Sequence, residues 1–329
     1  MTAYRQKYKR KKRKIKGVRS ILCICAVCLT TLFLSNYLIN KINAKTGLSV
    51  KSSKVIVGDG INQIVANNLY SSNAILINLD DNQILLDKSS DERIYPASLT
   101  KIMTAIVAIE NLPDLHEMIY LPENIFKKLY SEGASMAGFL PNEKVEAIDL
   151  IYGVLLPSGA ESCIGLADAI AGSERKYVKL MNEKAKELGM KNTHFTNSTG
   201  LHHRNHYSTV NDIAKLLEYA LQNDTFREVF TSKRHSTKAT NLHPDGITFH
   251  STMFKHMSTK EVNNGIIQGG KTGYTEEAKL CLASLAKIDG KEYILVTANA
   301  EGNPQTEQFN ISDAFSVYNQ IFENSAVSK

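Results

Sequence analysis

The sequence contains only one long hydrophobic run and, beyond its first 20 residues, no excess of positive charge. The 329-residue chain has a net charge of +6, but residues 1–20 hold ten Lys or Arg and no acid. The remaining 309 residues carry 29 basic and 33 acidic groups, so the body is mildly acidic. A nucleic-acid-binding body is therefore excluded, as is a polytopic membrane protein. The hydrophobic content of 43% excludes wholesale disorder.

Cysteines are also scarce. Three of the five lie inside the hydrophobic run, which leaves Cys163 and Cys281 for the body, both in apolar stretches. The body has no C-x-x-C pair, so a zinc ribbon or a redox motif is unsupported. We expect two buried thiols, with a single disulfide as the alternative. No cofactor is predicted.

The hydrophobic run follows directly on the basic segment. Residues 21–40 carry no charge, and twenty helical residues at about 1.5 Å each span a bilayer core of roughly 30 Å. A flanking cluster of cations keeps its side of a span in the cytoplasm. We therefore expect a cytoplasmic tail (1–20), a single transmembrane signal anchor (21–40), a stalk (41–70) and an extracellular body held at the cell membrane. A signal peptide cleaved near Ala44, or a nuclear-localisation or RNA-binding tail, are the alternatives.

Strand patterns occupy both ends of the body, and helical patterns lie between them. The expected hairpins are Ala74–Leu79 with Gln83–Asp87, and Leu280–Lys287 with Tyr293–Ala298. The expected helices are a buried one over 99–112 and others near 148–156, 163–171, 174–188, 212–221 and 312–322, with a polar loop at 190–210. This arrangement predicts an α/β (α+β) domain over 71–325, in which both ends of the body form one sheet.

A Ser-x-x-Lys pattern occurs three times, at Ser98/Lys101, Ser173/Lys176 and Ser284/Lys287. In a helix, residues i and i+3 share a face, so a lysine of depressed pKa can act as the base for a serine nucleophile. The second copy opens a charged surface helix, and the third lies in a strand, where its side chains face apart. Only Ser98 begins a buried helix, and its alternative role is that of a helix N-cap.

Two further motifs accompany this pair. Pro157-Ser158-Gly159 separates two apolar helices, and Lys271-Thr272-Gly273 lies on a predicted strand, where it offers a cation, a hydroxyl and a bare backbone to a peptide. Residues 265–272 also match the P-loop pattern, but a P-loop lies between a strand and a helix, and here a hairpin follows.

The three motifs together are those of penicillin-binding proteins and class A β-lactamases. The longer strings YPASLTKIMTA, EGASMAGFLPNEKV, LLPSGAES, HFTNSTGLHHRNHYST and GGKTGYT, in order over residues 70–300, resemble the low-molecular-mass penicillin-binding serine D-alanyl-D-alanine carboxypeptidases, peptidase family S11. The resemblance implies the DD-peptidase/β-lactamase-like fold, an antiparallel sheet flanked by helices with an all-helical lobe. It also implies a metal-free enzyme that takes part in peptidoglycan synthesis and cell shape.

The resemblance assigns a role to each motif position. Ser98 corresponds to the acylated nucleophile, Lys101 to its general base and Ser158 to a proton relay. The substrate-binding positions are Lys271, Thr272, Gly273 and Tyr274. Lys271 and Thr272 would hold the carboxylate of the substrate or β-lactam, and the backbone amides of Ser98 and Tyr274 would form the oxyanion hole. The implied partners are a peptidoglycan stem peptide ending in D-Ala-D-Ala and β-lactam antibiotics.

The sequence departs from the family at two places. Ala160 stands where the second motif usually has Asn, and residues 288–329 contain no Arg to bind a terminal carboxylate. These departures keep open a non-catalytic wall-binding or β-lactam-sensing protein. A β-lactamase is the other alternative, although residues 188–217 contain no Glu for deacylation. A zinc site at His202, His203 and His206 lacks an acidic ligand nearby.

Overall fold

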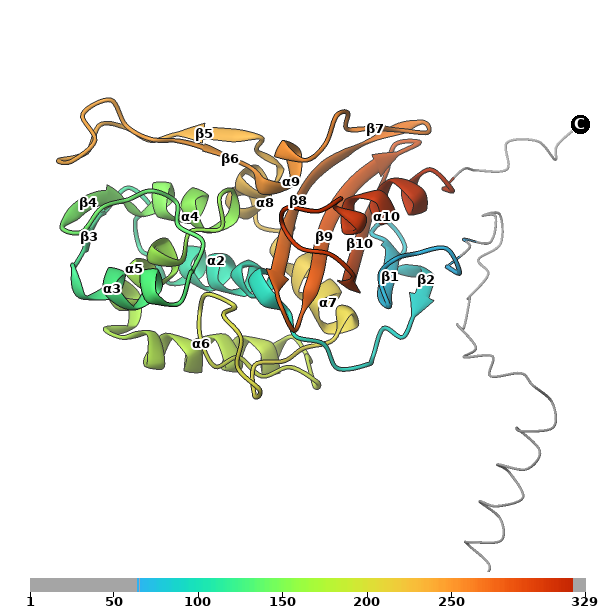
Figure 1. Cartoon of the computed structure of the whole chain (residues 1–329), viewed down its shortest axis with the longest axis horizontal. Helices are drawn as coiled ribbons and strands as arrows, with labels where there is room; N and C mark the ends of the chain where they lie inside the picture. Colours follow the sequence, from blue (N-terminus) through green and yellow to red (C-terminus); the bar gives the residue numbers. More distant parts are fainter. Residues whose placement is uncertain (1–63, 65, 322–329) are drawn as a thin grey trace, which may run out of the picture. The chain divides into compact units, whose positions relative to one another are not determined.

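The computed structural model describes residue 64 and residues 66–321. Its main sheet has the order β2-β1-β10-β9-β8-β7, and every neighbouring pair is antiparallel (Figure 1). The strands are β1 (Asn73–Asn78), β2 (Gln83–Lys88), β7 (Glu261–Val262), β8 (Gly265–Thr275), β9 (Lys279–Ile288) and β10 (Lys291–Ala300). The first hairpin therefore pairs with the last strand, which confirms the prediction of one sheet built from both ends of the body.

Both faces of this sheet are covered because its central strands are apolar on both sides. All six residues of β1 are buried. On one face, Leu76, Leu282 and Leu295 pack with α10 (Phe309–Tyr318). On the other, Ile75 and Val296 join the core formed with the helices. Such doubly buried strands are continuous apolar runs rather than alternating ones.

The helices cluster around α2 (Thr100–Asn111), whose residues from Thr100 to Ala108 are all buried. α2 contacts α4 (Ala147–Leu155), α5 (Ala160–Ala171), α6 (Glu174–Glu187), α7 (Val210–Ala220) and α8 (Asp224–Thr231). The polar loop between α6 and α7 was predicted, and the helix bounds agree with the predicted ones to within a few residues. A short 3-10 turn, η1 (Ala97–Leu99), precedes α2 and contacts β8 and β9. The first residues of α2 thus lie at the junction of helices and sheet.

Several short elements differ from the expectation of helix and loop. β3 (Met118–Leu121) pairs with β4 (Glu143–Glu146), and β5 (Arg234–Ser236) pairs with β6 (Thr248–His250). α8 and two further helices, α3 (Asn124–Ser131) and α9 (Thr252–Lys255), were not predicted either. Tertiary contacts hold them in place. The buried carboxylate of Glu143 accepts hydrogen bonds from the Leu140 amide, the Thr240 hydroxyl and the His243 ring. No local periodicity signals such contacts between distant segments.

Cys163 and Cys281 are free and buried, as expected from their apolar surroundings. Within the described residues, no helix is both long and apolar enough to cross a bilayer. The predicted tail (1–20), anchor (21–40) and nearly all of the stalk (41–70) lie outside the described residues.

Candidate active site

Ser98 and Lys101 meet at the start of α2. Ser98 lies in η1, Lys101 lies in the first turn of α2, and Lys101 Nζ is 3.2 Å from Ser98 Oγ. Lys101 Nζ also donates a hydrogen bond to the Thr199 carbonyl oxygen at 2.5 Å. The N-cap alternative for Ser98 is wrong, because neither η1 nor α2 has a side-chain cap hydrogen bond. The Ser98 hydroxyl instead has the lysine nitrogen as its neighbour.

The other two Ser-x-x-Lys copies have structural roles. Ser173 is the N-cap of α6, where its hydroxyl accepts from the Lys176 amide. Ser284 is buried in the middle of β9 and contacts the Tyr318 hydroxyl at 3.0 Å. Both results agree with the interpretation made from their sequence contexts.

Ser158 occupies the turn between α4 and α5 and is 3.0 Å from Lys271 Nζ. Its backbone is left-handed, with φ of 69°, which is uncommon for a residue that carries a side chain. Strained backbone of this kind persists where surrounding contacts fix it. The turn therefore aims the Ser158 hydroxyl at the buried lysine from a different part of the chain.

Lys271, Thr272 and Gly273 lie within one uninterrupted strand, β8, so residues 265–272 do not form a P-loop. Lys271 is fully buried and donates to its neighbour's carbonyl at 2.8 Å as well as to Ser158. A Cβ placed on Gly273 would be 3.2 Å from the Ser98 amide nitrogen. The bare backbone therefore lets β8 approach the serine closely.

The Ser98 amide is approached from a second direction by the loop after α6. Gly200 has a φ of +81°, and a Cβ there would lie 2.0 Å from the Ala97 carbonyl oxygen and 3.0 Å from the Ser98 amide nitrogen. Glycine is thus required at this contact. The loop and β8 thus both pack closely against the backbone of Ser98.

Both site lysines are buried, and burial is the largest cause of their pKa shifts. The pKa of Lys101 is lowered by desolvation, with partial compensation from the thiol of Cys163 and the carboxylate of Glu161. The pKa of Lys271 is lowered well below the ordinary lysine value by desolvation and by the positive charge of Lys101. Burial thus disfavours the charged form of both amines, and the positive charge of Lys101 adds to this effect at Lys271.

Ala160, at the first position of α5, is buried, and its backbone amide donates to the Ser135 carbonyl at 2.8 Å. Glu161 does not replace the missing amide side chain. Its carboxylate turns away to accept from the backbone amides of Ala137 and Gly138 at 2.7 and 2.9 Å. The pair of contacts fastens the 132–145 segment beside the second motif.

The three histidines after α6 do not gather around one point. His206 is buried, its Nε2 contacts the Thr100 hydroxyl at 2.8 Å, and its Nδ1 accepts from the Thr196 amide. His202 is 3.4 Å from the Glu277 carboxylate. No group of three potential metal ligands occurs among residues 64 and 66–321.

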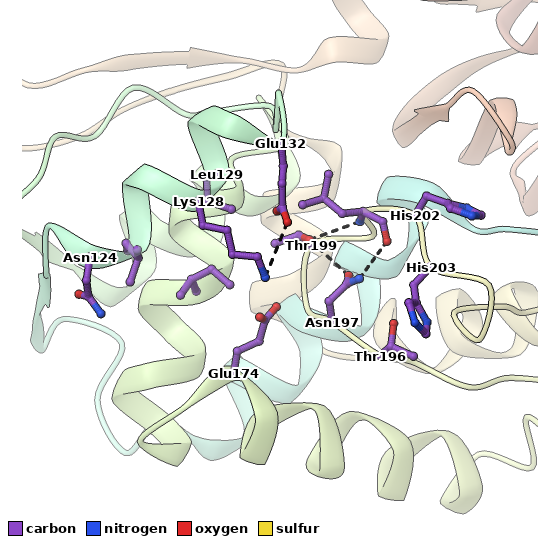
Figure 2. A pocket seen from close by; sticks show the side chains of 13 residues that line it. Asn124, Lys128, Leu129, Glu132, Glu174, Thr196, Asn197, Thr199, His202 and His203 are labelled. Carbon is purple, nitrogen blue, oxygen red and sulfur yellow. Dashed lines mark hydrogen bonds and ion pairs between the residues drawn. The ribbon is translucent and has the colours of Figure 1, made fainter.

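A cavity of about 400 Å³ opens between α3, the start of α6 and residues 196–203 (Figure 2). Thr199 lines it and also accepts the hydrogen bond from Lys101, so the cavity borders Lys101. Lys128 and Glu132, an ion pair of 3.8 Å, form one wall, and Glu174 points into the cavity from the opposite wall. No sequence motif marks this cavity, because its lining residues come from segments far apart in the chain.

The predicted residues are therefore brought together. Ser98, Lys101, Ser158 and Lys271 form two Ser–Lys pairs, Thr272 and Gly273 flank them on β8, and Tyr274 is the next residue of that strand. Sequence reasoning missed Thr199, the acceptor for Lys101, and Thr252, which contacts Thr272. Neither threonine stands in a pattern that predicts its contact, and only the fold shows which side chain it meets.

The comparisons with known proteins agree with this geometry. The D-alanyl-D-alanine carboxypeptidase family model, peptidase S11, matches residues 61–302. The D-alanyl-D-alanine carboxypeptidase DacF of Bacillus subtilis is 33% identical over 255 residues, which cover 75% of this chain and 63% of that protein. A D-alanyl-D-alanine carboxypeptidase of Streptomyces sp. strain K15 is 31% identical, covering 72% of this chain and 82% of its own length.

The structural comparison gives the same result. The crystal structure of the Streptomyces K15 DD-transpeptidase superposes with a TM-score of 0.70 at 27% identity, covering 78% of this chain and 98% of that one. The family match extends over well more than half of the chain and includes every motif that meets at Ser98. The chain belongs to the D-alanyl-D-alanine carboxypeptidase family, peptidase S11.

Proposed function

We propose that the protein is a serine-type D-alanyl-D-alanine carboxypeptidase that removes the terminal D-Ala from peptidoglycan stem peptides. The observation that carries this proposal is the 3.2 Å contact between the Ser98 hydroxyl and the nitrogen of the buried Lys101. A desolvated lysine amine is a base strong enough to accept the serine proton, and it needs no metal to do so.

The reaction follows from the positions of the groups. Ser98 Oγ attacks the carbonyl carbon of the penultimate D-Ala while its proton passes to Lys101 Nζ. The oxyanion that forms lies at the Ser98 amide, against β8. When the peptide C–N bond breaks, the proton held on Lys101 Nζ passes through the hydroxyl of Ser158, which contacts Lys271, to the leaving D-Ala nitrogen. Water then hydrolyses the Ser98 ester and restores the hydroxyl.

The two ends of the substrate would lie on opposite sides of Ser98. Lys271 and Thr272 of β8 offer a cation and a hydroxyl to the terminal carboxylate. The acyl part of the stem peptide would extend toward Thr199 and into the cavity of Figure 2. The cavity walls carry both charge signs, which suits a polar, charged peptide side chain.

The same serine would be acylated by penicillin, because the β-lactam carbonyl and carboxylate replace those of the peptide. The test is mass spectrometry of the protein after incubation with a D-Ala-D-Ala-terminated pentapeptide and, separately, with penicillin. We expect release of one D-Ala from the peptide and a covalent penicillin adduct on Ser98. A stable adduct without any peptide turnover would instead indicate a β-lactam-sensing protein.

Ala160 is the feature that favours the sensing alternative, because its methyl group forms no hydrogen bond. A missing neutral hydrogen bond is worth about 0.5–1.5 kcal/mol, or roughly 2- to 13-fold in rate. That loss is too small to abolish catalysis. Ala160→Asn should therefore change peptide turnover by less than about 100-fold, even if the new bond is charge-assisted. Restoration of a silent native protein by several orders of magnitude would refute the carboxypeptidase proposal.

We further propose that residues 21–40 anchor the protein in the cell membrane with the catalytic domain outside. The support is the uncharged run of 20 residues preceded by ten cations. Protease added to intact protoplasts should then remove the catalytic domain and leave a membrane-held stub. Protection of the domain would place it on the cytoplasmic side, away from the wall.

A further inference from the structure

The short helix α9 lies directly against the strand that carries Lys271, Thr272 and Gly273. Thr252, its first residue, is half-buried, and its hydroxyl oxygen is 2.7 Å from that of Thr272. The Thr252 amide donates to the Leu156 carbonyl at 3.0 Å, two residues before Ser158. Thr252 therefore joins the second and third motifs and contacts one substrate-binding side chain.

The next residue fixes the position of α9. Met253 is buried, and its sulfur would be 2.4 Å from a Cβ on Gly270, so the helix packs on the bare backbone of β8. This contact leaves the Thr252 side chain little freedom to move away from Thr272. The hydroxyl–hydroxyl hydrogen bond is thus held by packing on one side and by a backbone hydrogen bond on the other.

A threonine hydroxyl has one proton to donate and two lone pairs to accept. If Thr272 donated its proton to Thr252, it would have none for a carboxylate, which only accepts. If Thr252 is the donor, the Thr272 proton is free to point at the substrate. Hydrogen bonds in such a chain also polarise and strengthen one another.

We propose that Thr252 is a positioning residue that donates to Thr272 and thereby orients the Thr272 hydroxyl toward the terminal carboxylate of the ligand. The inference rests on the proposed function, because it assigns the carboxylate to β8. It also explains how binding of a free C-terminus is reinforced in a chain whose residues 288–329 contain no Arg. Thr252 acts through Thr272 and does not touch the reacting atoms.

The experiment compares the full-length native protein with Thr252→Val, which keeps the shape but loses the hydroxyl, and Thr252→Ser, which keeps it. We measure the acylation rate constant with benzylpenicillin and with its methyl ester, which lacks the carboxylate, and kcat and KM for the pentapeptide. Thr252→Val should slow acylation by benzylpenicillin about 2- to 13-fold, and it should raise KM more than it lowers kcat. With the methyl ester its rate should change less than 2-fold, and Thr252→Ser should be near native.

The matched control is Thr248→Val. It removes another hydrogen bond between two hydroxyl groups, because the exposed Thr248 hydroxyl lies 2.8 Å from the hydroxyl of Ser236. It should leave both acylation rates unchanged. If Thr252→Val does not fold, the same rates are measured with Thr252→Ala. Equal losses with benzylpenicillin and its methyl ester would overturn the proposal, since a purely structural tie would act on both. No loss with either would also overturn it.

The penicillin arm separates this proposal from the carboxypeptidase proposal. A native protein that is acylated by benzylpenicillin but does not cleave the peptide would refute the enzyme function, while the carboxylate dependence of Thr252→Val would still decide the role of Thr252. A native protein that is not acylated at all would overturn both.

Discussion

Lys271 Nζ donates to Ser158 Oγ at 3.0 Å, although the two residues come from a strand and an interhelical turn that are 113 positions apart. The lysine is fully buried and the serine nearly so. A buried amine of lowered pKa next to a hydroxyl can pass a proton in either direction without crossing bulk water. In the proposed reaction this pair complements the Ser98–Lys101 pair, because Lys101 takes the proton of the nucleophile and Ser158 relays it to the leaving group.

The assignment of the nucleophile predicts a selective loss of labelling. Ser98→Ala should abolish covalent attachment of penicillin, because only this serine of the three Ser-x-x-Lys copies contacts the side-chain nitrogen of its lysine. Ser173→Ala and Ser284→Ala should still be labelled, since those side chains cap α6 and contact Tyr318. Fluorescent penicillin on a denaturing gel measures the outcome, and a labelled Ser98→Ala protein would contradict the assignment.

The general-base role of Lys101 predicts a pH dependence. Burial lowers the pKa of Lys101, so its neutral fraction rises with pH at values below those of a free lysine. The acylation rate should therefore increase with pH, with a midpoint below the ordinary lysine pKa of 10.5.

Lys101→Arg is the control, because a guanidinium does not deprotonate in this range. It should not be acylated at any pH. Stopped-flow acylation by penicillin across this range provides the measurement. Acylation of Lys101→Arg at the native rate would exclude the lysine as base.

The left-handed backbone of Ser158 predicts that glycine destabilises the fold less than alanine at this position. A Cβ at φ of 69° costs about 1–2 kcal/mol, which glycine avoids. Ser158→Gly and Ser158→Ala lose the same hydroxyl, so both should lose peptide turnover. Ser158→Gly should nevertheless unfold at higher denaturant than Ser158→Ala, by about 1 kcal/mol after the greater chain entropy of glycine is counted. Urea titration would contradict this if the alanine variant were the more stable.

His206 predicts a loss of stability in acid. Desolvation is the largest cause that lowers the pKa of His206 to about 3. Because its Nδ1 accepts from the Thr196 amide, the folded state holds the neutral ring. Between pH 6.5 and about 3 the unfolded chain binds a proton that the folded one does not, so stability falls as pH falls through this window.

His206→Gln, which can still accept from Thr196 and donate to Thr100, should flatten that part of the profile. The measurement is the free energy of unfolding of both proteins at several pH values from 4 to 7. Parallel profiles for the two proteins would show that His206 is not the titrating group.

The sequence predicted the site better than its surroundings, for a physical reason. Ser98, Lys101, Ser158 and Lys271 stand in short motifs whose spacing is fixed by one helix turn, one interhelical turn and one strand. Long periodic elements such as α2 and β9 were also predicted, since burial imposes their pattern. β4, in contrast, is only four residues long and includes the buried Glu143, whose side-chain partners Thr240 and His243 lie about 100 positions away. The sequence likewise does not mark Thr252, because its proposed role depends on a contact with Thr272, which lies in a different element.

The position of β1 between β2 and β10 has a consequence for folding. Asn299 and Asn73, whose side chains hydrogen-bond at 2.7 Å, are 226 residues apart. The apolar strand β1 is made first but acquires its partner β10 only when nearly the whole domain has been synthesised. Pairings of such long range close slowly, and an unpaired apolar edge is prone to aggregation meanwhile. The nascent domain therefore depends on protection of β1 until its last strand arrives, and truncation before β10 would leave the sheet open in its middle.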